Sequence, residues 1–356
     1  MSSNNEENSL FNFQWHITEK CNLRCTHCYQ EDYSSAGEMS FEELRFVADK
    51  LIQTLSKWNK KGKIAITGGE PFVKSELFPL LEYLNESTQI ANIYILSNGT
   101  LIDEKICKEI VNIKKVSRVQ ISLDGASART HNAIRGQGTF EKAIEAIKLL
   151  NNHADYGIKV NIMFTLQKCN KEDIPALFDL AIENKINSLL VERFVPCGRG
   201  KQIKSEMLSS HELQEVFQYI SDRADLEYDK GNRLMVVKQR PLWINIDLEK
   251  ANVNAEIPLH KQVGGICSIG FDNLTILHDG TVLPCRRLNI PIGDLKSDTL
   301  FDIWYNSDIL WEMRNKQNLL KGKCSSCELI PLCSGCRAMA YACTGDYLGE
   351  DPQCWK

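Results

Sequence analysis

The sequence of 356 residues lacks any apolar run that approaches the length of a membrane span, so we expect no spanning segment. The first nine residues are polar and acidic and do not resemble an export signal. A net charge of -4 leaves no broad basic surface, which argues against nucleic acid as a partner. These absences predict a cytoplasmic protein that acts neither in a membrane nor on nucleic acid.

Cysteine, by contrast, is abundant, and its distribution is uneven. A cytoplasmic protein with 14 cysteines is not expected to use them as disulfides. Eight of them fall in the last ninety residues, a density that predicts a metal-binding region there: Cys267, Cys285, Cys324, Cys327, Cys333, Cys336, Cys343 and Cys354.

Three further cysteines lie within eight residues near the start, in the run Cys21-Asn-Leu-Arg-Cys25-Thr-His-Cys28. Three thiolates can hold three irons of a cubane cluster and leave the fourth iron open, whereas iron–sulfur clusters normally take four cysteines. An open coordination site is typical of reactive metal centres. A zinc knuckle is the alternative, with His27 as fourth ligand, but a tetrahedral site would be cramped between Cys25 and Cys28.

Beyond residue ten, strand-like and helix-like runs alternate, which predicts an α/β fold with a parallel sheet and right-handed crossovers. The expected strands are Phe13–Thr18, Lys63–Thr67, Asn92–Leu96, Arg118–Leu123, Ile158–Thr165 and Ser188–Phe194. The expected helices are Ser40–Trp58, Ser75–Asn85, Asp103–Asn112, Phe140–Asn151 and Lys171–Glu183. Six such units suit a partial (β/α)6 barrel similar to a TIM barrel, whose chemistry collects at the carboxyl ends of the strands.

We expect four segments along the chain. Residues 1–10 form a tail, residues 11–230 the partial barrel, residues 231–262 a connector, and residues 263–356 a small cysteine-rich domain. Within that last domain, Asp279-Gly280 predicts the turn of a β-hairpin. Taken alone, its Cys-x-x-Cys pairs would also suit zinc ribbons.

Polar motifs follow the expected strands of the barrel. After the second strand comes Thr-Gly68-Gly69-Glu70-Pro71, in which two glycines let the backbone approach a ligand and Glu70 supplies an acceptor. Loops after the third and fourth strands carry Ser97 and Asn98, then Ser122 and Asp124, and Arg135 precedes a glycine further on.

The three-cysteine run, the aromatic Tyr29 after it and the Gly-Gly-Glu-Pro motif together resemble the radical S-adenosylmethionine (SAM) superfamily. The resemblance implies a [4Fe–4S] cluster on Cys21, Cys25 and Cys28 whose open iron chelates SAM. It further implies that Tyr29, Gly68, Gly69, Glu70, Pro71, Ser97, Asn98, Ser122, Asp124 and Arg135 line the SAM site. In that family the Gly-Gly-Glu-Pro motif contacts the SAM amino group, and the arginine lies near the SAM carboxylate.

The C-terminal cysteines resemble the SPASM extension, which holds two auxiliary [4Fe–4S] clusters. By family position, one auxiliary cluster uses Cys324, Cys327, Cys333 and Cys354, and the other uses Cys267, Cys285 and Cys336. The second set is one cysteine short, so its fourth ligand is Cys343, water, another side chain such as His260, or the substrate. Cys343 follows Cys336 by two helical turns if Arg337–Ala342 is helical.

The resemblance implies that a ferredoxin- or flavodoxin-type reductant starts the reaction and that a 5′-deoxyadenosyl radical takes a hydrogen atom from substrate. An auxiliary cluster then accepts an electron, which gives oxidation or a thioether cross-link, or a thiol returns a hydrogen, which gives epimerisation. Cys197, after the sixth strand, is the better-placed candidate donor, and Cys169, after the fifth, is the other. Cys107 lies in an expected outer helix and is interpreted as a packing residue.

Four functions remain open. A peptide maturase is the first hypothesis; only twenty residues precede Cys21, so we expect a separate protein, or the barrel and extension themselves, to hold the leader peptide. A sulfatase-type maturase is disfavoured because Arg286 stands where those enzymes carry an acid, and arginine cannot act as a base. A small-molecule enzyme, such as a tetrapyrrole side-chain decarboxylase or a sugar-alcohol dehydrogenase, would use Arg286 and Arg287 to hold carboxylates. The last alternative is a non-catalytic zinc scaffold.

Overall fold

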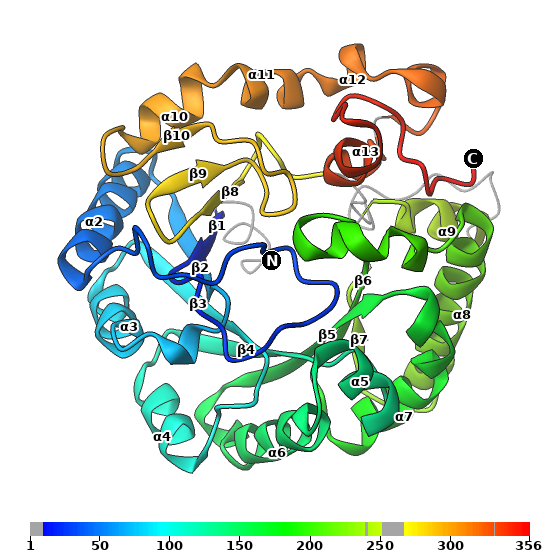
Figure 1. Ribbon diagram of the computed structural model, residues 1–356, viewed down its shortest axis with the longest axis horizontal. Helices are drawn as coiled ribbons and strands as arrows, with labels where there is room; N and C mark the ends of the chain where they lie inside the picture. Colours follow the sequence, from blue (N-terminus) through cyan, green and yellow to red (C-terminus); the bar gives the residue numbers. More distant parts are fainter. Residues whose placement is uncertain (1–9, 239–240, 251–266, 331) are drawn as a thin grey trace.

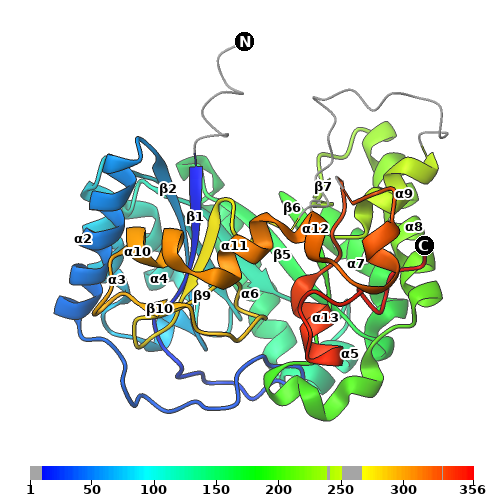
Figure 2. The ribbon, with the colours of Figure 1, turned by 90° about the horizontal axis from the view of Figure 1, so that it is seen from above.

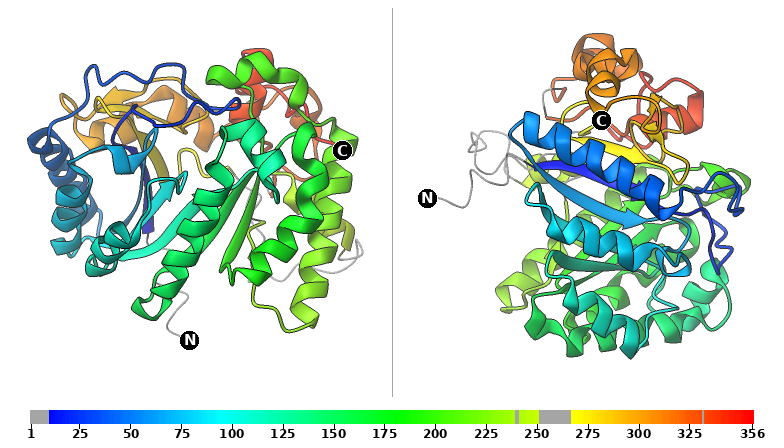
Figure 3. Two further views of the ribbon diagram at one scale, coloured as in Figure 1. Left: turned by 60° about the horizontal axis from the view of Figure 1, so that its bottom comes forward. Right: turned by 90° about the vertical axis from the view of Figure 1, so that its left-hand side faces the viewer.

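A computed structural model describes residues 10–238, 241–250, 267–330 and 332–356. Within these ranges the chain forms one ten-stranded sheet in the order β10-β9-β8-β1-β2-β3-β4-β5-β6-β7. The sheet is strongly curved, and helices cover its outer face (Figure 1). Figure 3 shows the same layering from two other sides.

Six parallel strands in sequence order make the barrel, as the alternating pattern predicts. They are β1 (Leu10–His16), β2 (Lys61–Thr67), β3 (Ile90–Ser97), β4 (Val116–Ser122), β5 (Lys159–Leu166) and β6 (Ser188–Arg193). Each pairs in parallel with the next along the chain. The prediction of a partial (β/α) barrel is therefore confirmed.

The helices of the barrel include the five that were predicted and two that were not. The predicted ones are α2 (Phe41–Lys57), α3 (Leu77–Glu86), α4 (Glu104–Asn112), α6 (Thr139–Asn152) and α7 (Ile174–Glu183). The additional ones are α5 (Ala128–Arg135) and α8 (Ser210–Asp229). The short α5 is rich in polar residues, so its apolar periodicity is weak, but a capping Ser127 accepts a hydrogen bond from Thr130 N and begins it. Arg135 is thus the last residue of a helix.

Short 3₁₀ segments connect several of these elements. They are η1 (Pro71–Val73), η2 (Ala154–Tyr156), η3 (Lys168–Asp173) and η4 (Gly198–Glu206). Three of them, η1, η3 and η4, follow strands β2, β5 and β6, so they border the end of the barrel at which chemistry is expected.

Strand β1 shows how the core fixes what faces the barrel interior. Phe11, Phe13 and Trp15 are almost fully buried, and the Phe11 ring contacts Trp58 after α2 at 5.5 Å between centroids. Successive strand residues point to opposite faces. His16, at the carboxyl end of β1, therefore points into the barrel.

The cysteine-rich extension continues the barrel sheet. Strand β8 (Asn273–Ile276) pairs in parallel with β1, and β9 (Thr281–Leu283) pairs antiparallel with β8. The predicted turn at Asp279-Gly280 is confirmed, and Gly280 has a φ of +96° that suits glycine. The short β10 (Gly293–Asp294) closes the edge beyond β9.

Short helices complete the extension and lie across the open side of the barrel (Figure 2). They are α10 (Leu300–Asn306), α11 (Asp308–Arg314), α12 (Lys316–Leu319), η6 (Gly322–Ser326) and α13 (Arg337–Thr344). The predicted helix at Arg337–Ala342 is confirmed as part of α13. In the described part of the chain, no helix combines the length and apolar character that crossing a membrane requires.

The expected connector contains two elements, β7 (Met235–Val236), which pairs with β6, and α9 (Trp243–Lys250). His260, the suggested cluster ligand, lies outside the described residues. The C-terminus is tied back to the barrel, because Arg193 at the end of β6 forms a bidentate pair with Asp351 at 3.0 and 2.8 Å. Both side chains are buried, and Gln353 accepts a further bond from Arg193 at 3.1 Å.

Candidate active site

The three N-terminal cysteines lie in the loop that follows β1. Cys25 is buried, whereas Cys21 and Cys28 are half-buried. The Cys21 sulfur accepts a hydrogen bond from Leu23 N at 3.4 Å, and the Cys28 sulfur accepts one from Gln30 N at 3.5 Å. Burial raises the pKa of Cys21 to about 11, and the carboxyl of Glu70 and the other two thiols add to the shift. A bound metal would therefore be needed to hold these groups as thiolates.

The Gly-Gly-Glu-Pro loop is hydrogen-bonded to the segment that leads into the cysteines. Gly69 N donates to Thr18 O at 2.8 Å, and Glu70 N donates to Lys20 O at 2.9 Å. A Cβ on Gly68 would lie 2.5 Å from Thr18 O, and one on Gly69 would lie 2.7 Å from Glu19 O. The two glycines are thus required for this close approach.

Glu70 is fully buried behind this loop. Its carboxylate accepts hydrogen bonds from Ser97 Oγ at 2.8 Å and from Asn98 N at 2.7 Å. Burial raises the pKa of Glu70 to about 7, and the hydrogen bonds from Asn98, Ser97 and Phe72 only partly offset this effect. The Arg135 guanidinium also acts to lower this pKa, but burial remains the larger effect.

The other predicted SAM-site residues lie around the same loop. Asn98 Nδ2 donates to Asn22 Oδ1 at 3.0 Å and is 4.0 Å from the Cys21 sulfur. Tyr29 Oη donates to Gly68 O at 3.3 Å. Pro71 begins η1 directly after Glu70, and Ser122 ends β4 two residues before Asp124.

Asp124 and Arg135 form a buried ion pair beside the cysteines. Arg135 Nε donates to Asp124 Oδ2 at 2.5 Å, while Arg135 Nη1 is 3.8 Å from the Cys25 sulfur. Thr165 N donates to the second Asp124 oxygen at 2.7 Å, and His27 Nε2 lies 3.4 Å from Asp124. Burial opposes ionisation, but Arg135 and then His27 lower the pKa of Asp124. His27 therefore faces Asp124 in addition to flanking two cysteines.

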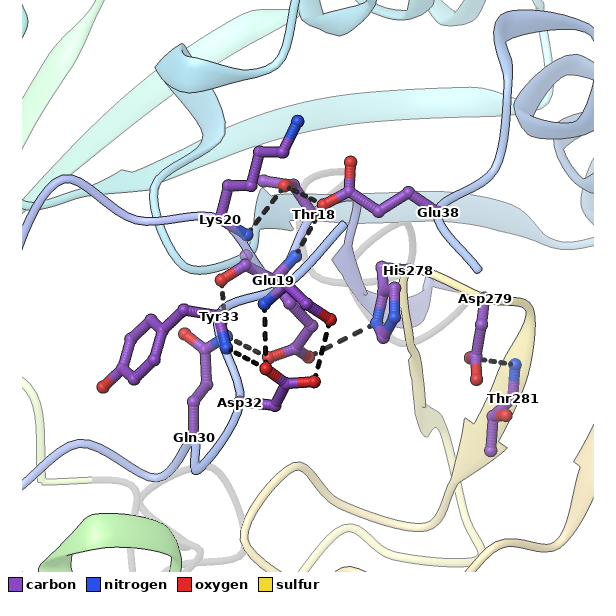
Figure 4. Close-up of polar contacts among 12 residues, drawn as sticks. Thr18, Glu19, Lys20, Gln30, Asp32, Tyr33, Glu38, His278, Asp279 and Thr281 are labelled. Atoms are coloured by element: carbon purple, nitrogen blue, oxygen red, sulfur yellow. Dashed lines mark hydrogen bonds and ion pairs between the residues drawn. The ribbon is translucent and has the colours of Figure 1, made fainter. Parts of the chain in front are cut away.

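The extension contacts this region through the turn between β8 and β9. Figure 4 shows Glu19, which directly precedes the cysteine loop, with His278 of that turn. Their Oε1 and Nδ1 atoms are 3.4 Å apart, and Gln30 Nε2 also donates to the Glu19 carboxylate. Although burial lowers it, Glu19 raises the pKa of His278 above its usual value. The sequence analysis missed both residues; their places beside the cysteine run and at the hairpin turn were the available signals.

The two adjacent arginines have different surroundings. Arg287 Nη2 pairs with Glu192 at 3.1 Å and is held at the end of β6. Arg286 lies over the Tyr29 ring, 4.3 Å from its centroid, with Glu19 at 3.8 Å. Arg286 is 8% exposed, and its Nε has no hydrogen-bond partner among the described residues.

His16 completes the polar lining next to Arg286. It is fully buried, its ring meets Tyr29 edge-on at 5.6 Å, and neither ring nitrogen has a partner in the described part of the chain. Burial, Arg286 and His278 all lower the pKa of His16 well below its usual value, so the ring is neutral. Arg286 and His16 thus both contact Tyr29 and both carry buried nitrogens without a partner in the described part of the chain, as expected where a polar ligand binds.

The remaining barrel cysteines differ in their surroundings. Cys107 is fully buried in α4, which confirms it as a packing residue. Cys169 is exposed, and its backbone N–H donates to Glu206. Cys197 is half-buried; burial raises its pKa, whereas Arg287 and Arg286 oppose that shift. Of the two candidate hydrogen donors, Cys197 is the one beside the arginines.

The extension cysteines fall into two groups. Burial raises the pKa of Cys267 to about 11, and the nearby Cys336 and Cys285 thiols contribute. Burial raises the pKa of Cys333, with a contribution from the nearby Cys324 thiol, and burial raises the pKa of Cys354, with a contribution from the nearby Cys333 thiol. This grouping is compatible with the two predicted ligand sets, which stay predictions. Cys327 N donates to Cys324 O at 3.4 Å.

Cys343 packs against other sulfur atoms. Its sulfur lies 3.9 Å from both Met207 Sδ and Met339 Sδ. In the ranges that the structure describes, no three His, Cys, Asp or Glu side chains converge as one metal ion requires. Half-buried thiols that are spaced in this way suit a cluster larger than a single metal ion.

Comparison with known proteins defines the class. The radical SAM superfamily matches residues 15–181, and the SPASM iron-sulfur cluster-binding domain matches residues 267–337. The chain belongs to the radical SAM superfamily and carries a SPASM domain. It is therefore an enzyme, and membership implies [4Fe–4S] clusters and SAM as its cofactors.

Several relatives cover nearly the whole chain. The AdoMet-dependent heme synthase of Methanosarcina barkeri is 30% identical over 349 residues, which span 96% of this chain and 95% of that protein. The Fe-coproporphyrin III synthase of the same organism is 30% identical, over 96% of this chain and 86% of the relative. Mycofactocin maturase MftC of Mycolicibacterium smegmatis is 26% identical, over 96% and 81%.

A solved structure shares the fold. Streptococcus suis SuiB bound to its precursor peptide SuiA gives a TM-score of 0.76 over 97% of this chain and 76% of that chain, at 21% identity. At this identity the likeness concerns the fold alone.

Proposed function

We propose that the enzyme oxidises a carboxylate-bearing side chain of an iron tetrapyrrole, with loss of carbon dioxide. The observation that carries this proposal is Arg286, a buried guanidinium with an unpaired Nε at the contact between the cysteine loop and the extension. An arginine in this position suits recognition of a carboxylate. The similarity to heme and Fe-coproporphyrin III synthases supports a tetrapyrrole as the molecule that carries it.

The cofactor ligands are part of the proposal. Cys21, Cys25 and Cys28 hold the SAM-binding cluster, while Glu70 and Arg135 approach the amino and carboxylate groups of SAM. Cys324, Cys327, Cys333 and Cys354 hold one auxiliary cluster, and Cys267, Cys285 and Cys336 hold the other. When bound, these groups supply the 5′-deoxyadenosyl radical and a one-electron acceptor.

The reaction balances as follows. A propionate side chain loses one hydrogen atom from the carbon next to the ring. It then loses carbon dioxide and one electron, which leaves a vinyl group. Bound SAM would take up that hydrogen atom together with one electron from a ferredoxin- or flavodoxin-type reductant, and would be released as methionine and 5′-deoxyadenosine. The cytoplasm provides both this reductant and conditions that keep thiols reduced.

The protein's own part is to bind and orient. Arg286 holds a substrate carboxylate, and the Tyr29 ring beneath it fixes the guanidinium plane. Neutral His16 offers a hydrogen bond next to it, and Glu19 with His278 keeps the extension turn against the cysteine loop. These contacts place the carboxylate close to the SAM cluster loop and exclude water from it.

The test uses anaerobically reconstituted full-length enzyme with SAM, dithionite and an iron tetrapyrrole that carries propionates. We expect product lighter by carbon dioxide and two hydrogens. Arg286→Gln should raise the substrate KM at least about tenfold, because a charge-assisted hydrogen bond is worth roughly 1.5–3 kcal/mol. Arg286→Lys should recover part of the loss, and exposed Lys201→Gln is the control. Unchanged kinetics in Arg286→Gln would contradict the role of Arg286.

A second candidate is maturation of a ribosomally made peptide, by cross-linking or epimerisation. The similarity to mycofactocin maturase and the fold shared with peptide-bound SuiB support it. Cys197, beside the arginines, would then be the hydrogen donor, and a separate protein could hold the leader. Modification of a supplied precursor peptide, with no mass change in any tetrapyrrole, would favour this function over the first.

A further inference from the structure

A buried arginine in the extension has no carboxylate partner. Arg337 directly follows Cys336 and is fully buried at the start of α13. Its Nη1 donates to Tyr347 O at 3.0 Å and to Gly349 O at 2.6 Å. Nε and Nη2 have no hydrogen-bond partner, and the guanidinium has no ion pair, among the described residues. Lys321 and, to a smaller extent, Arg337 lower the pKa of Asp346, but the Asp346 carboxylate is paired with Lys321 at 2.6 Å. Since arginine stays charged in proteins, Arg337 is a buried cation without an ion pair of its own in the described part of the chain.

Asp351 lies close to Gly335, as Arg337 does, but it is not available as a partner for Arg337. Asp351 is committed to the bidentate pair with Arg193, at 3.0 and 2.8 Å. It also accepts a hydrogen bond from Cys336 N at 2.8 Å. The Arg193–Asp351 pair is neutral as a unit, so the charge on Arg337 remains to be balanced.

A second buried cation lies beside another cysteine of the same group. Lys316, 4% exposed at the start of α12, donates to Cys267 O at 3.4 Å and to Met313 O at 3.3 Å. Its ammonium lies over the Phe271 ring, 4.4 Å from the centroid. In the part of the chain that the structure describes, it forms no ion pair with an acid.

Cations therefore lie around this group of cysteines: Lys316 lies near Cys267, Arg287 lies near both Cys285 and Cys336, and Arg337 directly follows Cys336 in the chain. Arg287 is balanced by Glu192, whereas Lys316 and Arg337 form no ion pair with any residue that the structure describes. Isolated buried charges are costly unless they are paired. A [4Fe–4S] core held by three thiolates carries net negative charge, and one-electron reduction makes it more negative.

We propose that Lys316 and Arg337 are the counter-charges of the auxiliary cluster on Cys267, Cys285 and Cys336, and that they raise its reduction potential. Cations close to a cluster stabilise its reduced form more than its oxidised form. They are positioning residues that act through the cluster. A raised potential would suit this cluster as the acceptor of the substrate electron, and this part of the inference rests on the proposed function. The effect of the two cations on the potential does not depend on that function.

The test is a redox titration followed by EPR, on full-length protein without SAM or substrate. A background that carries Cys21→Ala, Cys25→Ala and Cys28→Ala leaves the auxiliary signals alone. Lys316→Met and Arg337→Met should each lower the reduced fraction of one auxiliary cluster at least tenfold at fixed potential, about 59 mV for one electron. The other auxiliary cluster serves as internal reference.

Matched variants separate charge from packing. Lys316→Arg and Arg337→Lys keep the charge and should titrate as the parent does. Lys50→Met removes a lysine that donates to Leu295 O at 2.7 Å and Asp298 O at 2.9 Å, and should also leave the potential unchanged. Unshifted titrations in both methionine variants would overturn the proposal.

The iron content of each variant is measured as well, to detect a variant that has lost its cluster. If Arg337→Met loses iron and Arg337→Lys keeps it, the counter-charge role of Arg337 is supported. If both variants lose iron equally, Arg337 has a packing role, and the potential measured in Lys316→Met then supports or overturns the proposal. Because no substrate is present, failure of the tetrapyrrole assay and failure of this titration are distinguishable.

Discussion

The proposed SAM pocket and the cysteine-rich extension differ in how a buried positive charge is balanced. In the pocket, Arg135 beside Cys25 has its own carboxylate, Asp124, at 2.5 Å. In the extension, Arg337 beside Cys336 bonds only to carbonyl oxygens among the described residues. SAM leaves after each turnover, so its pocket must be stable when empty. An auxiliary cluster stays, so its charge can serve as a permanent part of the fold.

The largest effect expected on the pocket side comes from the cysteines themselves. Cys25→Ala removes one of three cluster ligands, so release of 5′-deoxyadenosine from SAM under dithionite should fall below detection. Chromatography of the nucleoside product measures it. Exposed Cys169→Ala should retain normal release; continued release by Cys25→Ala would contradict the ligand assignment.

Removal of iron tests whether the extension depends on its cluster more than the barrel does. Chelation under oxidising conditions should reduce amide hydrogen-exchange protection in α12 and α13, because buried Lys316 and Arg337 then lose their counter-charge at a cost of several kcal/mol. Strands β2 to β4 should stay protected. Equal loss of protection in both regions would show that the extension does not depend on its cluster more than the barrel does.

Loss of the ion pair that joins the barrel to the extension should also lower stability strongly. Asp351→Asn leaves buried Arg193 without its counter-charge, so the free energy of unfolding should fall by about 3–5 kcal/mol. Urea unfolding under anaerobic conditions measures this. The double variant Arg193→Met/Asp351→Leu should lose less than the single one; a larger loss in the double variant would argue against the charge explanation.

Glu70 provides a smaller, pH-dependent test of the pocket. Its folded pKa of about 7 lies above its usual value, so the protonated form dominates below pH 7 and cannot accept the SAM ammonium as a carboxylate does. SAM affinity should therefore fall by about tenfold per unit as the pH falls below 7. Calorimetry at several pH values measures it. Glu70→Gln should bind SAM more weakly and without this pH dependence; a pH-dependent Glu70→Gln variant would locate the titration elsewhere.

The smallest expected effect is that of a helix cap, which should change stability without changing activity. Ser40 begins α2 with a capping box, in which Glu43 N donates to Ser40 Oγ at 3.3 Å and Ser40 N donates to the Glu43 carboxylate at 2.8 Å. Ser40→Ala should lower the free energy of unfolding by about 1 kcal/mol. Both 5′-deoxyadenosine release and the auxiliary potential should match the parent enzyme; a changed potential would mean that the regions are coupled through α2.

The barrel was predictable because its signals are local. Apolar periodicity and capping residues such as Ser40 located the strands and most helices, and the short motifs predicted the SAM-site residues, whose roles stay predictions. Long-range pairing left no such signal. The parallel pairing of β8 with β1 joins residues some 260 positions apart, and the contact of His278 with Glu19 depends on it.

Charge balance was equally invisible in the sequence. Arg286 and Arg287 are neighbours and read alike, yet only the fold places Glu192 beside one and the Tyr29 ring beneath the other. Arg337 follows a cysteine as Arg286 does, and nothing local shows that Asp351 is taken by Arg193. Tertiary contacts decide which buried cation remains available to bind a ligand.

The pairing of β8 with β1 has a practical consequence for shortened versions of this enzyme. A chain that stops before the SPASM domain would leave the backbone groups of β1 next to Asn12–Trp15 without their neighbour. Such an exposed sheet edge, flanked by Phe11 and Phe13, invites strand-to-strand aggregation. The catalytic half should therefore be purified attached to its extension, and poor solubility of the isolated half would reflect this open edge more than misfolding of the barrel.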